Sequence, residues 1–75
     1  MRLSDCIPGK KAKVIDLMVN PTYKKRILDL GMLPGTEVQI VRKAPFGGPI
    51  VVQLRGYQVS IRMTEAKNIE IESVS

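Results

Sequence analysis

Apolar and polar residues alternate along four segments of this chain, a pattern that predicts strands with one buried face. The segments are 36–43, 49–55, 57–63 and 68–74. In the first of them Val38 and Ile40 share the face that we expect to be buried, whereas Val41 falls among the polar residues. The inward positions predicted for the other three are Ile50, Val52, Leu54, Tyr57, Val59, Ile61, Met63, Ile69 and Ile71. Gly56 would supply the tight turn that joins two of these strands as a hairpin.

An earlier segment, residues 11–19, is a fifth predicted strand. Its sequence, KAKVIDLMV, is apolar and β-branched, but the alternation slips at Val14 and Ile15. Such a slip is typical of a strand with a bulge or a bend. We therefore expect this strand to be curved rather than flat.

One helix is predicted between the first two strands. Asn20 is a suitable N-cap, Pro21 suits the first helical position, and Gly31 can take the left-handed conformation that ends a helix. The intervening sequence is PTYKKRILDL. A second, single helical turn is expected at 64–67, with Thr64 as its cap.

The predicted helix is apolar on one face and on one flank. At about 100° per residue, Tyr23, Ile27 and Leu30 share the face that should seal the core, whereas Leu28 lies on a flank beside Lys24. The neighbouring basic residues Lys25 and Arg26 are polar surface positions by the same pattern. A solvated helix face and a specific anionic contact are both compatible with these basic residues.

Five short strands in 75 residues are too few for an ordinary two-sheet sandwich. A tightly curled sheet can instead bury one face on itself and remove its exposed edges. The sequence therefore predicts a single domain, residues 1–75, with a mainly β fold: a small SH3-like barrel of about five strands, with a helix inserted after the first.

The loop at 43–49 is rich in residues that interrupt regular structure. Pro45 and Pro49 fix their own φ, and the pair Gly47-Gly48 can take positive φ. Phe46, the single Phe of the chain, sits at the tip. It could fold back over the mouth of the barrel or serve as an anchor for a partner, and the sequence does not decide between the two.

The chain offers little catalytic or metal-binding chemistry. It has no His and one Cys, Cys6, so the commonest general base and the usual zinc ligand sets are missing. No phosphate-binding glycine motif precedes a helix. We therefore expect neither an enzyme nor a bound cofactor or metal. A single Cys and the lack of an apolar leader favour a cytoplasmic protein.

A net charge of +5 favours anionic partners, so a nucleic-acid-binding barrel is an alternative to a protein-binding one. The charge is scattered along the chain. Only Tyr23, Phe46 and Tyr57 could stack on bases, and Tyr57 points inward by pattern. We therefore do not expect nucleic acid as the partner.

An ordered series of motifs resembles the FeoA family. The series consists of RILDLG at 26–31, LPGT at 33–36, AP at 44–45, GGP at 47–49 and RGY at 55–57, followed by a charged turn before the last Ile. The resemblance extends from about Leu3 to Ile71. It implies an SH3-like barrel and an accessory role toward FeoB, a membrane protein with a cytosolic GTPase domain that moves Fe²⁺.

The resemblance implies an adaptor of bacterial ferrous iron transport rather than an iron-binding protein. The same domain is similar to the C-terminal part of iron- and manganese-dependent repressors, which leaves a detached repressor domain as a further alternative. Self-association also remains open. The candidate partner-binding residues are Lys24, Leu28, Met32, Leu33, Phe46, Gly47 and Gly48.

Overall fold

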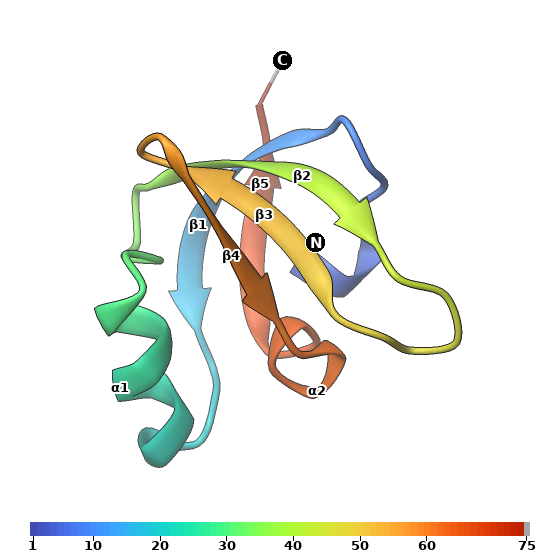
Figure 1. The fold of residues 1–75 in the computed structure, drawn as a ribbon. Helices are drawn as coiled ribbons and strands as arrows, with labels where there is room; N and C mark the ends of the chain where they lie inside the picture. The colour runs from blue at the N-terminus through green and yellow to red at the C-terminus, as the bar shows by residue number, and fades with distance from the viewer. Residues whose placement is uncertain (75) are drawn as a thin grey trace.

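The computed structural model describes residues 1–74, which form one curled antiparallel sheet with a longer helix on one side (Figure 1). The elements are η1 (Leu3–Asp5), β1 (Lys11–Leu17), α1 (Pro21–Asp29), β2 (Glu37–Lys43), β3 (Ile50–Leu54), β4 (Tyr57–Ile61), α2 (Met63–Ala66) and β5 (Ile69–Ser73). The strand order in the sheet is β4-β3-β2-β1-β5. The five predicted strands and the helix after the first are confirmed.

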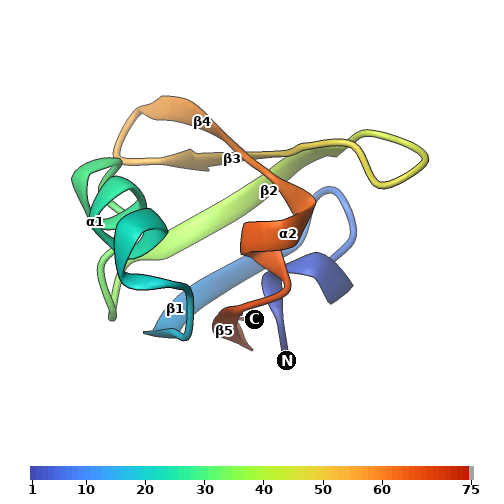
Figure 2. The ribbon, with the colours of Figure 1, turned by 90° about the horizontal axis from the view of Figure 1, so that it is seen from below.

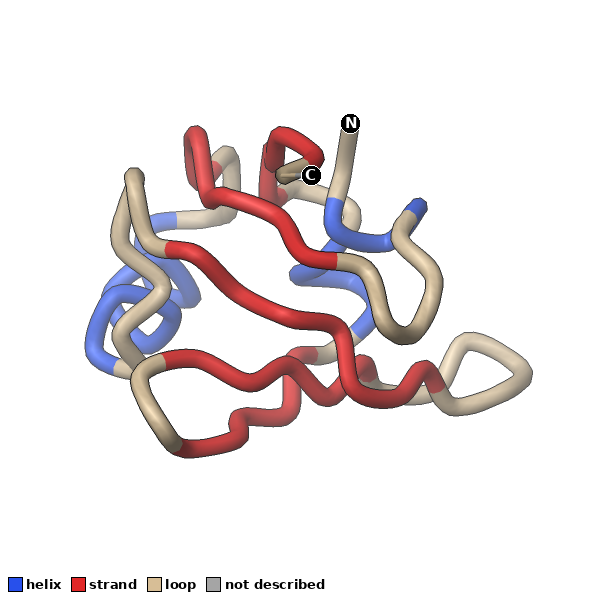
Figure 3. Tube along the Cα trace, turned by 90° about the horizontal axis from the view of Figure 1, so that it is seen from above, coloured by secondary structure: helices blue, strands red, loops and turns tan. Residues whose placement is uncertain are grey.

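The strands wrap around a common interior, as the view from above shows (Figure 3). Within residues 1–74 the hydrogen-bonded ladder does not continue from β4 to β5, and α2 connects these two edge strands. The N-terminal segment covers the β5 edge: Arg2 forms a bridge with Glu70, and the N–H of Ile71 donates to the carbonyl of Met1 at 2.7 Å. This cover protects an edge that would otherwise be free to pair with another chain.

The inward residues of all five strands form one core. Its fully buried members include Val14, Ile40, Ile50, Val52, Ile61 and Ile69, joined by Leu3 from η1, Ile27 from α1 and Met32. Burying such a side chain contributes about 1.5–3 kcal/mol. Cys6 is also buried here and is a free thiol. The alternation of the sequence thus gave the correct inward face of β2, β3 and β5.

The expected irregularity in the first strand is a β-bulge. The register of β1 against β5 shifts between Val14 and Asp16, and Ile15 turns to the exposed side. A second shift lies in β2 between Ile40 and Arg42, at the exposed Val41. Bulges bend and twist their strands, so these two help the small sheet to curl.

Helix α1 begins and ends as predicted. The side chain of Asn20 accepts a hydrogen bond from the N–H of Thr22 at 2.9 Å, and Gly31 has φ of +98° just beyond the helix. Ile27 is fully buried and Leu30 half-buried, but Tyr23 is 46% exposed. The expectation that Tyr23 seals the core is wrong, because it belongs to the first turn, beside a surface pocket that Asn20 and Asn68 also line.

Two other expectations are corrected. Tyr57 is 44% exposed rather than inward, because its hydroxyl donates to the carbonyl of Leu30 across the rim of the sheet. Helix α2 starts at Met63, one residue early, and its N-cap is Arg62 rather than Thr64. The backbone N–H of Arg62 is satisfied by the carboxylate of Glu65 at 3.2 Å. In the part of the chain described, neither helix has the length or hydropathy to cross a membrane.

Candidate functional site

The loop between β2 and β3 presents Phe46 to solvent. Phe46 is fully exposed (104%), with φ of +59°. This left-handed conformation costs a non-glycine residue about 1–2 kcal/mol. Because the side chain is fully exposed, it does not fold back over the mouth of the barrel, which was one of the two alternatives for this residue. A strained, exposed aromatic with no packing role is the kind of outlier that suggests a functional contact.

Hydrogen bonds hold the loop in shape. The N–H of Ala44 donates to the carbonyl of Pro49 at 3.0 Å, and the N–H of Gly48 donates to that of Pro45 at 3.2 Å. A side chain on Gly48 would collide with the Cβ of Ala44, and Gly47 has φ of +76°. Glycine is therefore favoured at both positions, for two different reasons. The result is a compact projection from the body of the protein (Figures 1 and 3).

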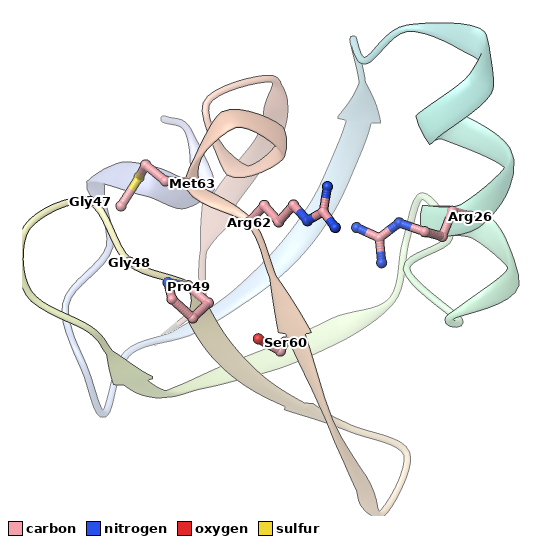
Figure 4. Close-up of a pocket in the computed structure, with 7 residues that line it drawn as sticks. All are labelled: Arg26, Gly47, Gly48, Pro49, Ser60, Arg62 and Met63. Atoms are coloured by element: carbon pink, nitrogen blue, oxygen red, sulfur yellow. The ribbon is translucent and has the colours of Figure 1, made fainter.

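A pocket of about 400 Å³ lies beside this loop (Figure 4). It is lined by Arg26, Gly47, Gly48, Pro49, Ser60, Arg62 and Met63. Arg26 comes from α1 and Arg62 from the junction of β4 and α2, and their guanidinium groups point toward one another. The pocket therefore joins three parts of the chain: the helix, the loop and the end of β4.

A buried carboxylate organises the arginine side of the pocket. Glu65 is only 3% exposed, and its Oε1 accepts from Nη2 of Arg26 and from the backbone N–H of Arg62. A buried charge is strongly unfavourable unless it is paired and hydrogen-bonded, so Glu65 fixes both neighbours. Of the basic residues on the helix, Arg26 makes an ion pair within the fold.

The structure divides the candidate partner-binding residues between two sides. Phe46, Gly47 and Gly48 lie on the loop. Lys24, Leu28 and Leu33 lie on or after α1, at the other end of the sheet (Figures 1 and 2). Lys24 is exposed and Leu33 is 40% exposed, while Leu28 is half-buried against the core.

Met32 is fully buried and so is not part of any surface. It packs in the core instead. Five of the seven pocket residues were not among the predicted site residues: Arg26, Pro49, Ser60, Arg62 and Met63. Alternation identified Ser60 and Arg62 as outward positions on the last part of a strand, but it gave no sign that Gly47 and Gly48 would lie beside them.

The described residues hold no group of three or more His, Cys, Asp or Glu side chains placed to bind a metal ion. The free thiol of Cys6 has its Sγ 3.7 Å from the Sδ of Met1. Burial, reinforced by the nearby charge of Asp5, raises the pKa of the Cys6 thiol. It therefore stays protonated at neutral pH, and a protonated thiol is a poor nucleophile and metal ligand.

Comparison with known proteins gives consistent matches. The model of the FeoA domain matches residues 1–73. An Fe(2+) transport protein A/Fe(2+) transporter FeoB fusion protein of Porphyromonas gingivalis is 33% identical over 75 residues. That alignment covers 100% of this chain but 9% of the fusion protein, so the chain spans about a tenth of that relative's length.

Solved structures show the same fold. The solution structure of the FeoA protein from Chlorobium tepidum has a TM-score of 0.92 at 32% identity, covering 100% of this chain and 71% of that one. Zinc-complexed Stenotrophomonas maltophilia FeoA, described as a procaryotic SH3 domain protein, has a TM-score of 0.77 at 33% identity, covering 96% and 89%. The predicted SH3-like fold is confirmed. The chain belongs to the FeoA family, the non-catalytic accessory proteins of ferrous iron transport.

Proposed function

We propose that this chain is a non-enzymatic adaptor that binds the cytosolic GTPase part of FeoB and thereby regulates ferrous iron uptake. The observation that carries the proposal is the fused relative, in which a region similar to this entire chain shares one polypeptide with the transporter FeoB. Covalent linkage raises the effective concentration of one module near the other. Such a linkage is useful where the two modules contact each other. Two separate chains need a binding interface to achieve the same proximity.

The loop at residues 44–49 supports a protein-binding role. A rigid, exposed aromatic can enter a pocket on a partner at little cost in conformational entropy. Phe46 meets this description, because hydrogen bonds close the loop beneath it and the side chain makes no packing contribution to the core. The base of the loop is tied to the body, since Nζ of Lys43 donates to the carbonyl of Ser4 at 2.6 Å.

A titration tests this proposal. The isolated GTPase domain of the FeoB protein from the same genome would be titrated with this chain, in the GDP state and with a non-hydrolysable GTP analogue. We expect saturable binding in at least one state. No association in either state, together with unchanged iron uptake after deletion of the gene, would contradict the proposal.

Two variants locate the binding surface. Phe46→Ala removes the aromatic from the loop, and Leu33→Ala is a matched control at the other end of the sheet, because both residues are exposed and apolar. We expect Phe46→Ala to weaken binding at least about tenfold, in the range of an interface hot spot, and Leu33→Ala less than threefold. The opposite ranking would assign the interface to the α1 side.

A further inference from the structure

The pocket beside the loop presents positive charge that the fold neutralises only in part. Arg26 and Arg62 point into the same space (Figure 4), where two like charges repel each other. Glu65 offsets one of them through its ion pair with Arg26. In the described part of the chain, the guanidinium group of Arg62 makes no ion pair or hydrogen bond with another residue.

Arg62 has a guanidinium group that is available to bind a ligand. Its backbone is held, because its N–H donates to Glu65 and its carbonyl accepts from the N–H groups of Glu65 and Ala66 at 3.0 and 2.8 Å. Its side chain is exposed and aimed at Arg26. A planar guanidinium with five N–H donors matches the two oxygens of a carboxylate. The backbone of Arg62 is therefore held in place, while the N–H donors of its guanidinium group are free to bind a ligand.

The remaining wall favours a side chain over a free anion. Pro49 and Met63 are apolar, and Ser60 offers a hydroxyl. A volume of about 400 Å³ leaves room for the methylene stem of an acidic residue as well as for its carboxylate. Gly47 and Gly48 belong both to the pocket wall and to the loop that carries Phe46, so a partner that contacts Phe46 comes within reach of the pocket.

We propose that this pocket receives the carboxylate of an Asp or Glu side chain from the protein partner, bound by Arg62 and by the N–H groups of Arg26 that Glu65 leaves free. The identity of the partner rests on the proposed function, but the chemistry of the pocket does not. Together with Phe46, the pocket gives a two-point contact: an apolar residue inserted into the partner and an acidic residue received from it.

The first test uses charge-matched variants in the same titration. Arg62→Gln removes the charge from the pocket but keeps the backbone hydrogen bonds, and Arg55→Gln removes the same charge from the turn between β3 and β4. We expect Arg62→Gln to weaken binding to the FeoB GTPase domain about tenfold or more, and Arg55→Gln less than threefold. Equal losses would mean that net charge alone matters and would overturn the pocket, while the adaptor function stands.

The second test needs no partner. The side-chain Nε–H resonances of Arg26, Arg62 and Arg55 would be followed by NMR while acetate, or separately inorganic phosphate, is added to the isolated chain. Saturable shifts with acetate at the first two arginines, absent at Arg55 and lost in Arg62→Gln, are expected. A lack of saturation overturns the pocket, and tighter binding of phosphate than acetate overturns a carboxylate ligand. If the GTPase domain does not bind at all, this titration still decides the pocket.

Discussion

The two ends of the sheet use their apolar residues in different ways. At the α1 end, Ile27 and Met32 are buried, and Leu28 and Leu30 pack against the core. At the other end, Phe46 projects from a loop whose residues hydrogen-bond to one another. An apolar residue beside a core has a structural reason to exist, whereas a strained and exposed one does not. The comparison therefore favours the loop as the binding surface.

The largest effect is expected from truncating the α1 side. Ile27→Ala removes a fully buried side chain and should lower the free energy of unfolding by about 2–5 kcal/mol. Leu28→Ala, at a half-buried position, should cost roughly half as much. Urea denaturation of both variants measures the difference. Equal losses would show that α1 is buried on two sides.

Gly31→Ala should be the next most damaging change. Its φ of +98° disfavours any side chain, and a Cβ there would collide with the hydroxyl of Tyr57. We expect a loss of about 2–4 kcal/mol in the free energy of unfolding. Gly35→Ala is the control, because Gly35 has a similar φ of +92° but open space around it. If both variants lose the same stability, the contact with Tyr57 is unimportant.

Removal of the Arg26 side chain tests the ion pair between Arg26 on α1 and Glu65 on α2. Arg26→Ala leaves the buried carboxylate of Glu65 without its ion-pair partner. Because the Arg26 side chain is 43% exposed, we expect a loss of about 1–3 kcal/mol rather than the full cost of an isolated buried charge. The double variant with Glu65→Gln should recover part of this loss in thermal denaturation. A double variant less stable than Arg26→Ala would mean that the carboxylate contributes through other contacts.

On the loop side, Phe46→Ala should leave the free energy of unfolding within about 0.5 kcal/mol of the parent, as expected of an exposed position. The same urea denaturation that follows Ile27→Ala measures it. If Phe46→Ala keeps its stability but weakens partner binding, Phe46 is a contact residue rather than a core residue. A clear destabilisation would show that the aromatic supports the loop.

Metal addition should have the smallest effect. A ligand that binds the folded state raises the thermal midpoint by mass action. We expect micromolar Fe²⁺ or Zn²⁺ to shift the midpoint by less than about 2 °C, because the residues described offer no cluster of metal ligands. The zinc complex of the Stenotrophomonas maltophilia relative makes Zn²⁺ the more demanding probe. A shift of many degrees that Cys6→Ala abolishes would reveal a site at the thiol.

Local pattern was enough for much of the fold. Alternation identified the inward residues of β2, β3 and β5, and cap chemistry placed α1 between Asn20 and Gly31. The pattern failed for Tyr23 and Tyr57, which stand at the ends of their elements. An amphipathic tyrosine can satisfy its hydroxyl at a rim, as Tyr57 does on Leu30, so its position in the alternation does not show its burial.

The sequence by itself determined the class of fold, the bulge in β1, the stiff loop and its aromatic tip, because these depend on residues a few positions apart. Only the tertiary structure decided what surrounds them. Arg26 and Glu65 are 39 residues apart in the sequence, and the curled sheet brings them together. Their ion pair offsets the cost of burying the Glu65 carboxylate. The same curl places Arg62 beside Gly47 and Gly48. Such long-range neighbours are set by the curling of the sheet around one core.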